Sequence, residues 1–384
     1  MKTIVRQAVT VFVAILCFGV RAESQTGKSL KEAYSGAFKM GCAISPSDIS
    51  GRNPGAIPLI LEQFNALSPD NCMKPESLHP RPDVWNFGPA DNYVNFGREH
   101  GMFVLGHTLC WHNQTPDFFW KHEDGSPKTH DELVETLRSY IETVCTHFAG
   151  KVDAYDVVNE IVAEDGGYRN IGWVEAFGGN GDEVVKLAFK FAAQYAPAGT
   201  ELYYNEFNVW RPTKLAGVIR LVKMLRAEGL RIDGVGIQAH WGLNYPKNQY
   251  IEDAIDQLSA LGVKVMITEL DVDVLPVSKE GQVIGKSLND PLYQQEEFEE
   301  FLDPYKNGLP EEVEDQLAAR YAELFGIFYK HRDQIDRLTF WGLHDGASWK
   351  NGSPVPRRTN YPLLFKRDLT PHKAFDAVIS IPEN

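Results

Sequence analysis

Cysteine, basic charge and long apolar runs are scarce in this 384-residue chain, and each scarcity excludes a class of protein. Five cysteines at irregular spacings form neither a dense disulfide framework nor a zinc knuckle. Lys and Arg number 38 against 52 Asp and Glu, a formal net charge of -14. Because phosphates demand basic side chains, we expect no nucleic-acid partner and no binding to anionic membranes.

One long apolar run, AVTVFVAILCFGV, follows two basic residues at the N-terminus and precedes a small-residue cleavage site ending at Ala22. This layout is typical of a secretory signal peptide, and the run is too short to span a membrane comfortably. We therefore predict a signal peptide over residues 1–22, a mature chain over residues 23–384, and a secreted or periplasmic location. A lipid anchor on Cys17 is the alternative, but Leu16 stands where such a peptidase needs a small residue.

Four cysteines remain in the mature chain, and three of them lie in or just after apolar runs. Buried free thiols and disulfide bridges therefore both stay open. The four are Cys42, Cys72, Cys110 and Cys145.

Short apolar runs alternate with helix-period stretches along the mature chain. Val218, Leu221, Val222 and Leu225 recur at helical spacing, and another such stretch runs from Val313 to Phe328. Eight runs in this alternation predict a single α/β domain, a (β/α)8 TIM barrel with extended loops. A doubly wound open sheet is the alternative, but the Gly-rich phosphate turn after its first strand is missing. The runs are FKMGCAIS, FNALS, FVLGHTL, DAYDVVNE, ELYYNEFNV, GVGIQAHW, VKVMITELDV and RLTFWGLHD.

Polar residues close nearly every one of these runs. In TIM barrels the chemistry takes place at the C-terminal ends of the strands. One polar residue there is an ordinary cap, but seven coincident cases indicate an active face. The pairs are Asn71 and Lys74, His107 and His112, Asn159 and Glu160, Asn205 and Glu206, Gln238 and His240, Glu269 and Asp271, and His344 and Asp345.

Two glutamates at these strand ends suggest one reaction. Glu160 closes the fourth run and Glu269 the seventh, so they face each other across the barrel mouth. Glycoside hydrolysis needs two carboxylates flanking a bond, one as proton donor and the other as nucleophile or base. Strand period places Asp271 and Ile267 on the side of Glu269. We predict that a chain Asp271–His240–Glu269 keeps the nucleophile ionised and oriented.

Three other interpretations of the strand ends carry less weight. Catalytic zinc barrels tend to show His-x-His on an early strand, whereas GHTLCWHNQ spaces its histidines five apart, so we predict no metal. Glu206 in NEFN could be a third catalytic carboxylate, but we expect it to form hydrogen bonds lining the cleft. Tryptophans fill cores by default, yet Trp341 and Trp349 flank a Gly-containing loop, so at least one should face the cleft. The histidines that could converge on a metal are His107, His112, His240 and His344.

Five motifs in chain order, GHTLCWHNQTP, YDVVNE, GIQAHW, ITELDV and FWGLHDGASW, resemble glycoside hydrolase family 10, the retaining endo-β-1,4-xylanases. The resemblance implies that Glu160 is the acid/base and Glu269 the nucleophile, with carboxyl groups about 5–5.5 Å apart. It further implies no cofactor and binding of xylan and xylo-oligosaccharides, and we expect a monomer. The residues it places around the substrate are Asp70, Asn71, Lys74, His107, Trp111, Asn159, Asn205, Gln238, His240, Trp341 and Trp349.

Two motifs depart from the family pattern. The family usually carries Glu-Asn-x-x-Lys where this chain has Asp70, and Asn-Asp-Tyr-Asn where it has NEFN, so Phe207 lacks a tyrosine hydroxyl. Both departures concern substrate positioning and not bond breaking. The segment from Val274 to Pro310 is also long for one loop.

Three alternative functions remain open from the sequence. A related barrel hydrolase cutting cellulose or mannan would share the paired glutamates but lack the whole set of motifs. An exo-acting xylosidase would need a closed pocket. A non-catalytic sugar-binding protein would have no reason to keep both Glu160 and Glu269.

Overall fold

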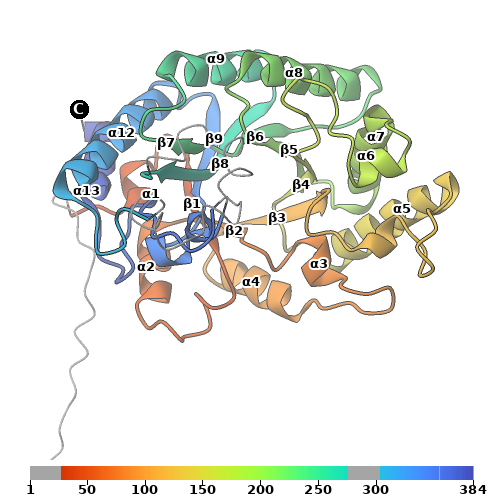
Figure 1. The fold of residues 1–384 in the computed structure, drawn as a ribbon, viewed down its shortest axis with the longest axis horizontal. Helices are drawn as coiled ribbons and strands as arrows, with labels where there is room; N and C mark the ends of the chain where they lie inside the picture. Colours follow the sequence, from red (N-terminus) through yellow and green to blue (C-terminus); the bar gives the residue numbers. More distant parts are fainter. Residues whose placement is uncertain (1–26, 276–302, 354, 384) are drawn as a thin grey trace, which may run out of the picture.

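The computed structural model describes residues 27–275, 303–353 and 355–383 (Figure 1). Within them, nine parallel strands form one sheet in the order β6-β5-β4-β3-β2-β1-β9-β8-β7, and β6 also pairs with β8. That pairing closes eight strands into a barrel, which confirms the predicted (β/α)8 fold. The strands are β1 (Lys39–Ile44), β2 (Ala66–Pro69), β3 (Phe103–Cys110), β4 (Ala154–Asn159), β5 (Glu201–Glu206), β6 (Gly234–Ile237), β7 (His240–Gly242), β8 (Lys264–Asp273) and β9 (Ile335–Phe340).

Helices surround the barrel between successive strands, as Figure 1 shows. The α-helices are α1 (Leu30–Ala33), α2 (Ala56–Gln63), α3 (Pro75–Leu78), α4 (Gly88–Glu99), α5 (His130–His147), α6 (Trp173–Ala176), α7 (Gly181–Tyr195), α8 (Pro212–Ala227), α9 (Asn248–Ser259), α12 (Glu311–Lys330) and α13 (Lys373–Ile379). The 3-10 helices are η1 (Asp117–Phe119), η5 (Asp345–Ala347), η6 (Trp349–Asn351) and η7 (Ile381–Glu383).

The predicted helical periodicity corresponds to burial against the barrel. In α8 the four periodic side chains are all buried, at Val218, Leu221, Val222 and Leu225. The α5 helix begins at a capping box, in which Thr129 and Glu132 satisfy each other's backbone N–H groups. A small apolar cluster from β3, β4, β5 and β8 fills the barrel interior with Leu105, Ala154, Tyr203 and Met266. Amphipathic helices on the outside and a packed interior therefore fix where the strand ends lie.

The sixth predicted run forms two strands and not one. β6 ends at Ile237 and β7 begins at His240, with Gln238 and Ala239 between them. Ala239 has a φ of 64°, a left-handed conformation that is uncommon for a residue with a Cβ. β7 then pairs with β8, its His240 opposite Asp271. The break carries His240 onto the rim beside the end of β8.

Strict side-chain alternation fails within β8. Ile267 and Leu270 both belong to the outer apolar cluster, although a three-residue separation would place them on opposite faces. The pairing of β8 with β9 shifts register between these two residues, as a bulge does. The predicted grouping of Ile267 with Glu269 is therefore wrong, because the bulge changes the phase. Glu269 and Asp271 still share one side, where both contact His240.

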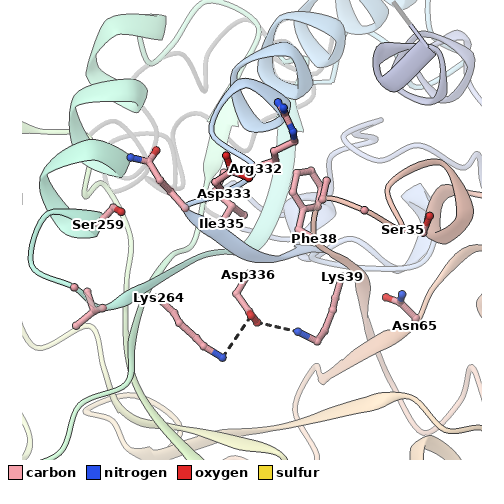
Figure 2. A pocket seen from close by; sticks show the side chains of 15 residues that line it. Ser35, Phe38, Lys39, Asn65, Ser259, Lys264, Arg332, Asp333, Ile335 and Asp336 are labelled. Atoms are coloured by element: carbon pink, nitrogen blue, oxygen red, sulfur yellow. Dashed lines mark hydrogen bonds and ion pairs between the residues drawn. The ribbon is translucent and has the colours of Figure 1, made fainter.

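The opposite end of the barrel carries its own charged pocket, of ≈ 740 Å³ (Figure 2). Figure 2 shows Asp336 between Lys264 and Lys39, whose Nζ atoms lie 3.4 and 3.1 Å from its carboxylate oxygens. Burial raises the pKa of Asp336, but the two lysines bring it below the ordinary value. The charges at this N-terminal end of the strands thus neutralise one another, and in barrels this face usually serves stability.

Three sequence predictions concern features away from the barrel mouth. The four cysteines of the described residues are buried free thiols, so the bridges left open are not formed. No helix in the described part of the chain is long and apolar enough to cross a membrane. The predicted signal peptide and most of the segment from Val274 to Pro310 lie outside the described residues.

Candidate active site

Glu160 stands at the rim directly after β4, held by two side-chain donors. Trp111 Nε1 donates to its Oε2 at 3.1 Å, and Gln238 Nε2 donates to its Oε1 at 2.9 Å. Trp111 directly follows β3, which pairs with β4, and Gln238 directly follows β6. Both residues were predicted to bind substrate, and the structure additionally places them on the carboxylate of Glu160.

The backbone of Glu160 is strained into position. Its φ of 58° lies in the left-handed region, which costs a non-glycine residue roughly 1–3 kcal/mol. Its N–H donates to Asn205 O at 3.0 Å, and Arg169 Nε donates to its carbonyl at 3.1 Å. Two residues on, the N–H of Val162 donates to Glu206 Oε2 at 3.1 Å. These contacts stabilise a turn that would otherwise relax and move the carboxylate.

Glu269 lies in β8 and is 5% exposed. Asn205 Nδ2 donates to its Oε1 at 2.7 Å, and His240 Nε2 lies 3.1 Å from its Oε2. His240 Nδ1 in turn lies 2.9 Å from Asp271 Oδ2, which also accepts from Trp349 Nε1 at 2.8 Å. The predicted chain Asp271–His240–Glu269 is therefore present.

A glycine makes room for the donor on Glu269. A Cβ at Gly236 would lie 2.3 Å from Asn205 Oδ1 and 2.7 Å from Thr268 Cγ2, closer than such atoms approach. Thr268 Oγ1 donates to Asn205 Oδ1 at 2.6 Å, which leaves the Nδ2 of Asn205 free to point at Glu269. The Asn205 amide also lies 3.0 Å from the amide of Asn159. Asn205 was predicted as a substrate residue, and here it orients a carboxylate.

The residues after β2 and β3 form a second cluster on the rim. Lys74 Nζ donates to Asn71 Oδ1 and to Gln114 Oε1, each at 2.9 Å. The same ammonium lies 5.1 Å from the ring centre of Trp111 and 5.9 Å from that of Trp341. An amine and amides beside aromatic faces suit a sugar ring, which offers hydroxyls at its edge and C–H groups on its faces.

His107 and Trp341 connect this cluster to Glu269. The His107 ring lies 5.4 Å from the Trp341 ring, and the Trp341 ring lies 6.5 Å from that of His240. His107 Nδ1 is 2.8 Å from Asp156 Oδ2, and both side chains are buried. Asp70 belongs to the same surroundings: burial raises its pKa, and the charges of Lys74 and His107 partly oppose that rise. Nearly all the predicted substrate residues thus form one continuous network.

The charge on Glu160 depends on its neighbours. Burial raises its pKa, but the hydrogen bonds from Gln238 and Trp111 and the charges of His112 and Arg169 bring the pKa below its ordinary value. Burial lowers the pKa of His112 itself to about 4, so this histidine contributes its charge only in acid. Glu160 is consequently ionised in the free protein, and a proton must come to it before it can act as an acid.

Glu206 does not line the cleft as predicted. It is fully buried, and Lys214, also fully buried, places its Nζ 2.9 Å from Glu206 Oε1. Tyr204 and the backbone N–H groups of Val162 and Phe207 also donate to its carboxylate. Glu206 therefore forms hydrogen bonds, as expected, but it does so behind Glu160, in the scaffold.

The four histidines weighed as metal ligands do not converge. His107 contacts Asp156, His240 lies between Glu269 and Asp271, and His344 accepts from Gly346 N–H. Within residues 27–275, 303–353 and 355–383, no group of three or more His, Cys, Asp or Glu side chains could hold a metal ion.

Sequence reasoning missed three residues of this network. Gln114 donates to Asn71 and accepts from Lys74, and it stands inside the motif GHTLCWHNQTP, which was the available signal. No comparable sequence motif marks Arg169, which donates to the Glu160 carbonyl, or Lys350, which lies beside Asp271. Only the packing of their loops in the folded protein brings these two side chains to the site.

The structure is a closed parallel barrel with two carboxylates at its strand ends. Trp111 and Gln238 donate hydrogen bonds to one carboxylate, and His240 with Asp271 supports the other. These features define the class of a barrel glycoside hydrolase. A model of the family described as glycosyl hydrolase family 10 matches residues 29–381. The chain belongs to this family. This family membership confirms the retaining endo-1,4-β-xylanase activity that the five motifs predicted.

Curated relatives and solved structures agree with this assignment. Endo-1,4-beta-xylanase A of Xylanibacter ruminicola is 36% identical over 369 residues, covering 96% of this chain and 97% of that protein. Beta-1,4-xylanase of Dictyoglomus thermophilum is 36% identical over 353 residues, with coverages of 91% and 90%. The structure of a family 10 endoxylanase from a sugarcane soil metagenome aligns with a TM-score of 0.83 at 34% identity, covering 92% of this chain and 99% of its own. A mutant solved in complex with xylotriose aligns at 0.79 and 35% identity, with coverages of 91% and 99%.

Proposed function

We propose that Glu160 is the acid/base and Glu269 the nucleophile of xylan hydrolysis in this protein. One residue carries the assignment because it links the two carboxylates. Gln238 donates through its side chain to Glu160 Oε1 at 2.9 Å, and its carbonyl accepts the N–H of Glu269 at 2.9 Å. A glycosidic bond bound beside Gln238 would therefore lie between the carboxyl groups of Glu160 and Glu269, as a double displacement requires.

In the first step Glu269 attacks the anomeric carbon while the glycosidic C–O bond breaks. Glu160 is ionised in the free protein and takes up a proton from solvent before this step. It gives that proton to the departing oxygen, so that a neutral hydroxyl leaves. In the second step the Glu160 carboxylate takes a proton from water, and the water oxygen attacks the same carbon. The bond to Glu269 then breaks, which restores both side chains and retains the anomeric configuration.

His240 supports Glu269 through both steps. Asp271 and Glu269 raise the pKa of His240 to about 9 although burial lowers it, so the imidazole is positively charged at neutral pH. A cation 3.1 Å from Glu269 Oε2 stabilises the negative charge of this carboxylate before it attacks and again when it leaves. Asn205 holds the second oxygen of Glu269, which restricts the direction of attack.

The substrate would extend from this centre over the cluster after β2 and β3. Asp70, Asn71 and Lys74 would bind the sugars on the glycone side, and Trp341 and Trp349 would cover the ring at the cut. The relative solved with xylotriose supports xylo-oligosaccharides as ligands of this site. Assays on polymeric xylan and on cellulose, with product lengths recorded, test the substrate: mainly short xylo-oligosaccharides indicate endo cleavage, whereas xylose alone would favour the exo-acting alternative.

Trapping the covalent intermediate tests the catalytic assignment directly. In a 2-deoxy-2-fluoro xylobioside the fluorine destabilises the oxocarbenium-like transition states of both steps, and a good leaving group speeds the first step alone. The glycosyl-enzyme therefore forms and accumulates, because its release stays slow. Mass spectrometry of proteolytic fragments should find the added sugar on the peptide containing Glu269. A label on any other carboxylate would overturn the assignment, and Glu269→Gln serves as the unlabelled control.

We further propose that the chain is exported, with residues 1–22 removed, and acts as a monomer. The support is the basic start, apolar run and small-residue site at the N-terminus. N-terminal sequencing of the mature protein should begin at Glu23. Light scattering should give the mass of one chain.

A further inference from the structure

A buried lysine stands behind the carboxylates that support Glu269. Lys350 lies in η6, directly after Trp349, and its side chain is 5% exposed. Its Nζ lies 3.7 Å from Asp271 Oδ1 and 3.7 Å from Asp273 Oδ2. Burying an ammonium is costly unless anions compensate it, so this lysine is held by the two aspartates of β8.

The two oxygens of Asp271 have separate partners. Its Oδ2 accepts from Trp349 Nε1 and contacts His240 Nδ1, whereas Oδ1 makes no hydrogen bond and faces Lys350. Charges thus alternate along one line from Lys350 through Asp271 and His240 to Glu269. A change of charge at Lys350 alters the electrostatic potential at Glu269, because all four side chains are at most 9% exposed and their interactions are weakly screened.

Asp273 competes with Asp271 for the same ammonium. Its Oδ1 is occupied by Asn360 Nδ2 at 3.0 Å and by the N–H of Leu275 at 2.9 Å. Its Oδ2 faces Lys350 and, like Asp271 Oδ1, makes no hydrogen bond. The lysine therefore divides its charge between an aspartate that contacts His240 and one that does not.

Other titratable groups around this line are few among the described residues. Burial raises the pKa of Tyr245, in the loop after β7, and the charge of Lys350 only partly opposes that rise. Burial and then Asp271 and Asp345 raise the pKa of Tyr321, on α12, so both tyrosines are neutral. Arg358 acts on Asp273, and Lys74 acts on Glu269 from the β2 side. Burial raises the pKa of Asp271, and the charges of His240 and Lys350 bring it below the ordinary value.

We propose that Lys350 is a positioning residue that sets the acid limit of activity, with Asp273 opposing it. The proposal rests on Glu269 being the nucleophile, as argued above. Lys350 offsets the negative charge of Asp271, which limits how tightly the His240–Glu269 pair holds a proton. Asp273 weakens that effect by drawing the ammonium toward itself.

Opposite charge changes should move the acid limit in opposite directions. Lys350→Met removes the cation and leaves the group of Asp271, His240 and Glu269 more negative. The apparent pKa of the acid limb of the kcat/KM profile should therefore rise by about one pH unit. Removing the competing anion with Asp273→Asn should lower the same limb by about half a unit. Lys350→Arg keeps the charge and should restore the wild-type limb, and the double variant Lys350→Met/Asp273→Asn should fall between the single variants.

An aryl xylobioside with a good leaving group is the substrate for these profiles, because its cleavage scarcely needs proton donation by Glu160. Lys373→Met is the matched control: its Nζ pairs with Glu311 and Asp315 at the surface, and its limb should not move. Melting temperatures at one pH show whether each variant is folded.

Two results would overturn the proposal. One is an unmoved acid limb in folded Lys350→Met and Asp273→Asn. The other is an equal loss of kcat in Lys350→Met and Lys350→Arg with both limbs unchanged, which would mean that the lysine only packs. If Lys350→Met does not fold, the downward shift in Asp273→Asn decides alone. The trapping experiment distinguishes a failure of this proposal from a failure of the assignment of Glu269 as nucleophile. If the label is on Glu269 and the acid limb does not move in the variants, the role of Lys350 is rejected and the nucleophile assignment stands.

Discussion

His240 Nε2 lies 3.1 Å from Glu269 Oε2, and the other ring nitrogen of His240 contacts Asp271 Oδ2. This arrangement places a positive charge beside the buried Glu269 at neutral pH. A charged imidazole there stabilises a carboxylate that must attack and then leave, as the proposed mechanism requires of Glu269.

The charge of His240 should appear in the pH dependence of stability. Its pKa is about 9 in the folded protein against an ordinary value of 6.5, so its contribution is complete below pH 6.5 and disappears as pH rises through 9. The free energy of unfolding should fall across this window by at most about 3.4 kcal/mol. Urea titrations at pH 6 and pH 9.5 measure the fall, which should be much smaller in His240→Gln. An equally large fall in that variant would contradict the charged imidazole.

Glu269→Ala should abolish turnover of every substrate, because no other group can form the covalent intermediate. Glu160→Ala should lose activity on xylan but retain the first step on aryl xylosides, since an activated leaving group needs no proton. Stopped-flow release of the aryl alcohol, followed beside steady-state xylan hydrolysis, distinguishes the two variants. If Glu160→Ala were equally inactive on both substrates while still folded, its acid role would be wrong.

Asp70→Glu should strengthen binding of short xylo-oligosaccharides. Glu is one methylene longer than Asp, and a hydrogen bond to a charged group contributes roughly 1.5–3 kcal/mol, which bounds the gain. kcat/KM on xylotriose and xylotetraose should rise, while kcat on an aryl xyloside stays constant. A large loss in the variant would mean that the surroundings of Lys74 and His107 are already fitted to the shorter side chain.

Glu206→Gln should destabilise the fold more than it slows the chemistry. The change leaves Lys214 without a full counter-charge in a fully buried position, and breaking a buried pair typically costs about 3–5 kcal/mol. Glu164→Gln is the matched control, because it removes the other carboxylate near Lys214, at 3.1 Å, from a partly exposed side chain. Thermal melts should show a large drop in Tm for the first variant and a small one for the second.

The barrel and the strand-end residues could be predicted from the sequence because both follow from local pattern. Eight apolar runs with helical stretches between them allow few folds, and in this fold every strand presents its last residues at one face. Glu160 and Glu269 were therefore identified without knowledge of any distance. The same local reasoning placed Asp271 and His240 beside Glu269, and the structure agrees.

Other parts of the site needed the tertiary structure, because they depend on how separate strands and loops lie against each other. The bulge in β8 separates Ile267 from Glu269, and no single strand encodes it, since it arises from pairing with β9. Burial decided that Glu206 supports the scaffold and not the cleft, because only packing shows that Lys214 reaches it. Lys350 lies 81 residues after Glu269 in the sequence, and only the folding of its loop over β8 brings its charge to Asp271. The sequence by itself thus determined which side chains gather at the barrel mouth, whereas the packing of loops and strands decided which of them hold the two carboxylates and which belong to the scaffold.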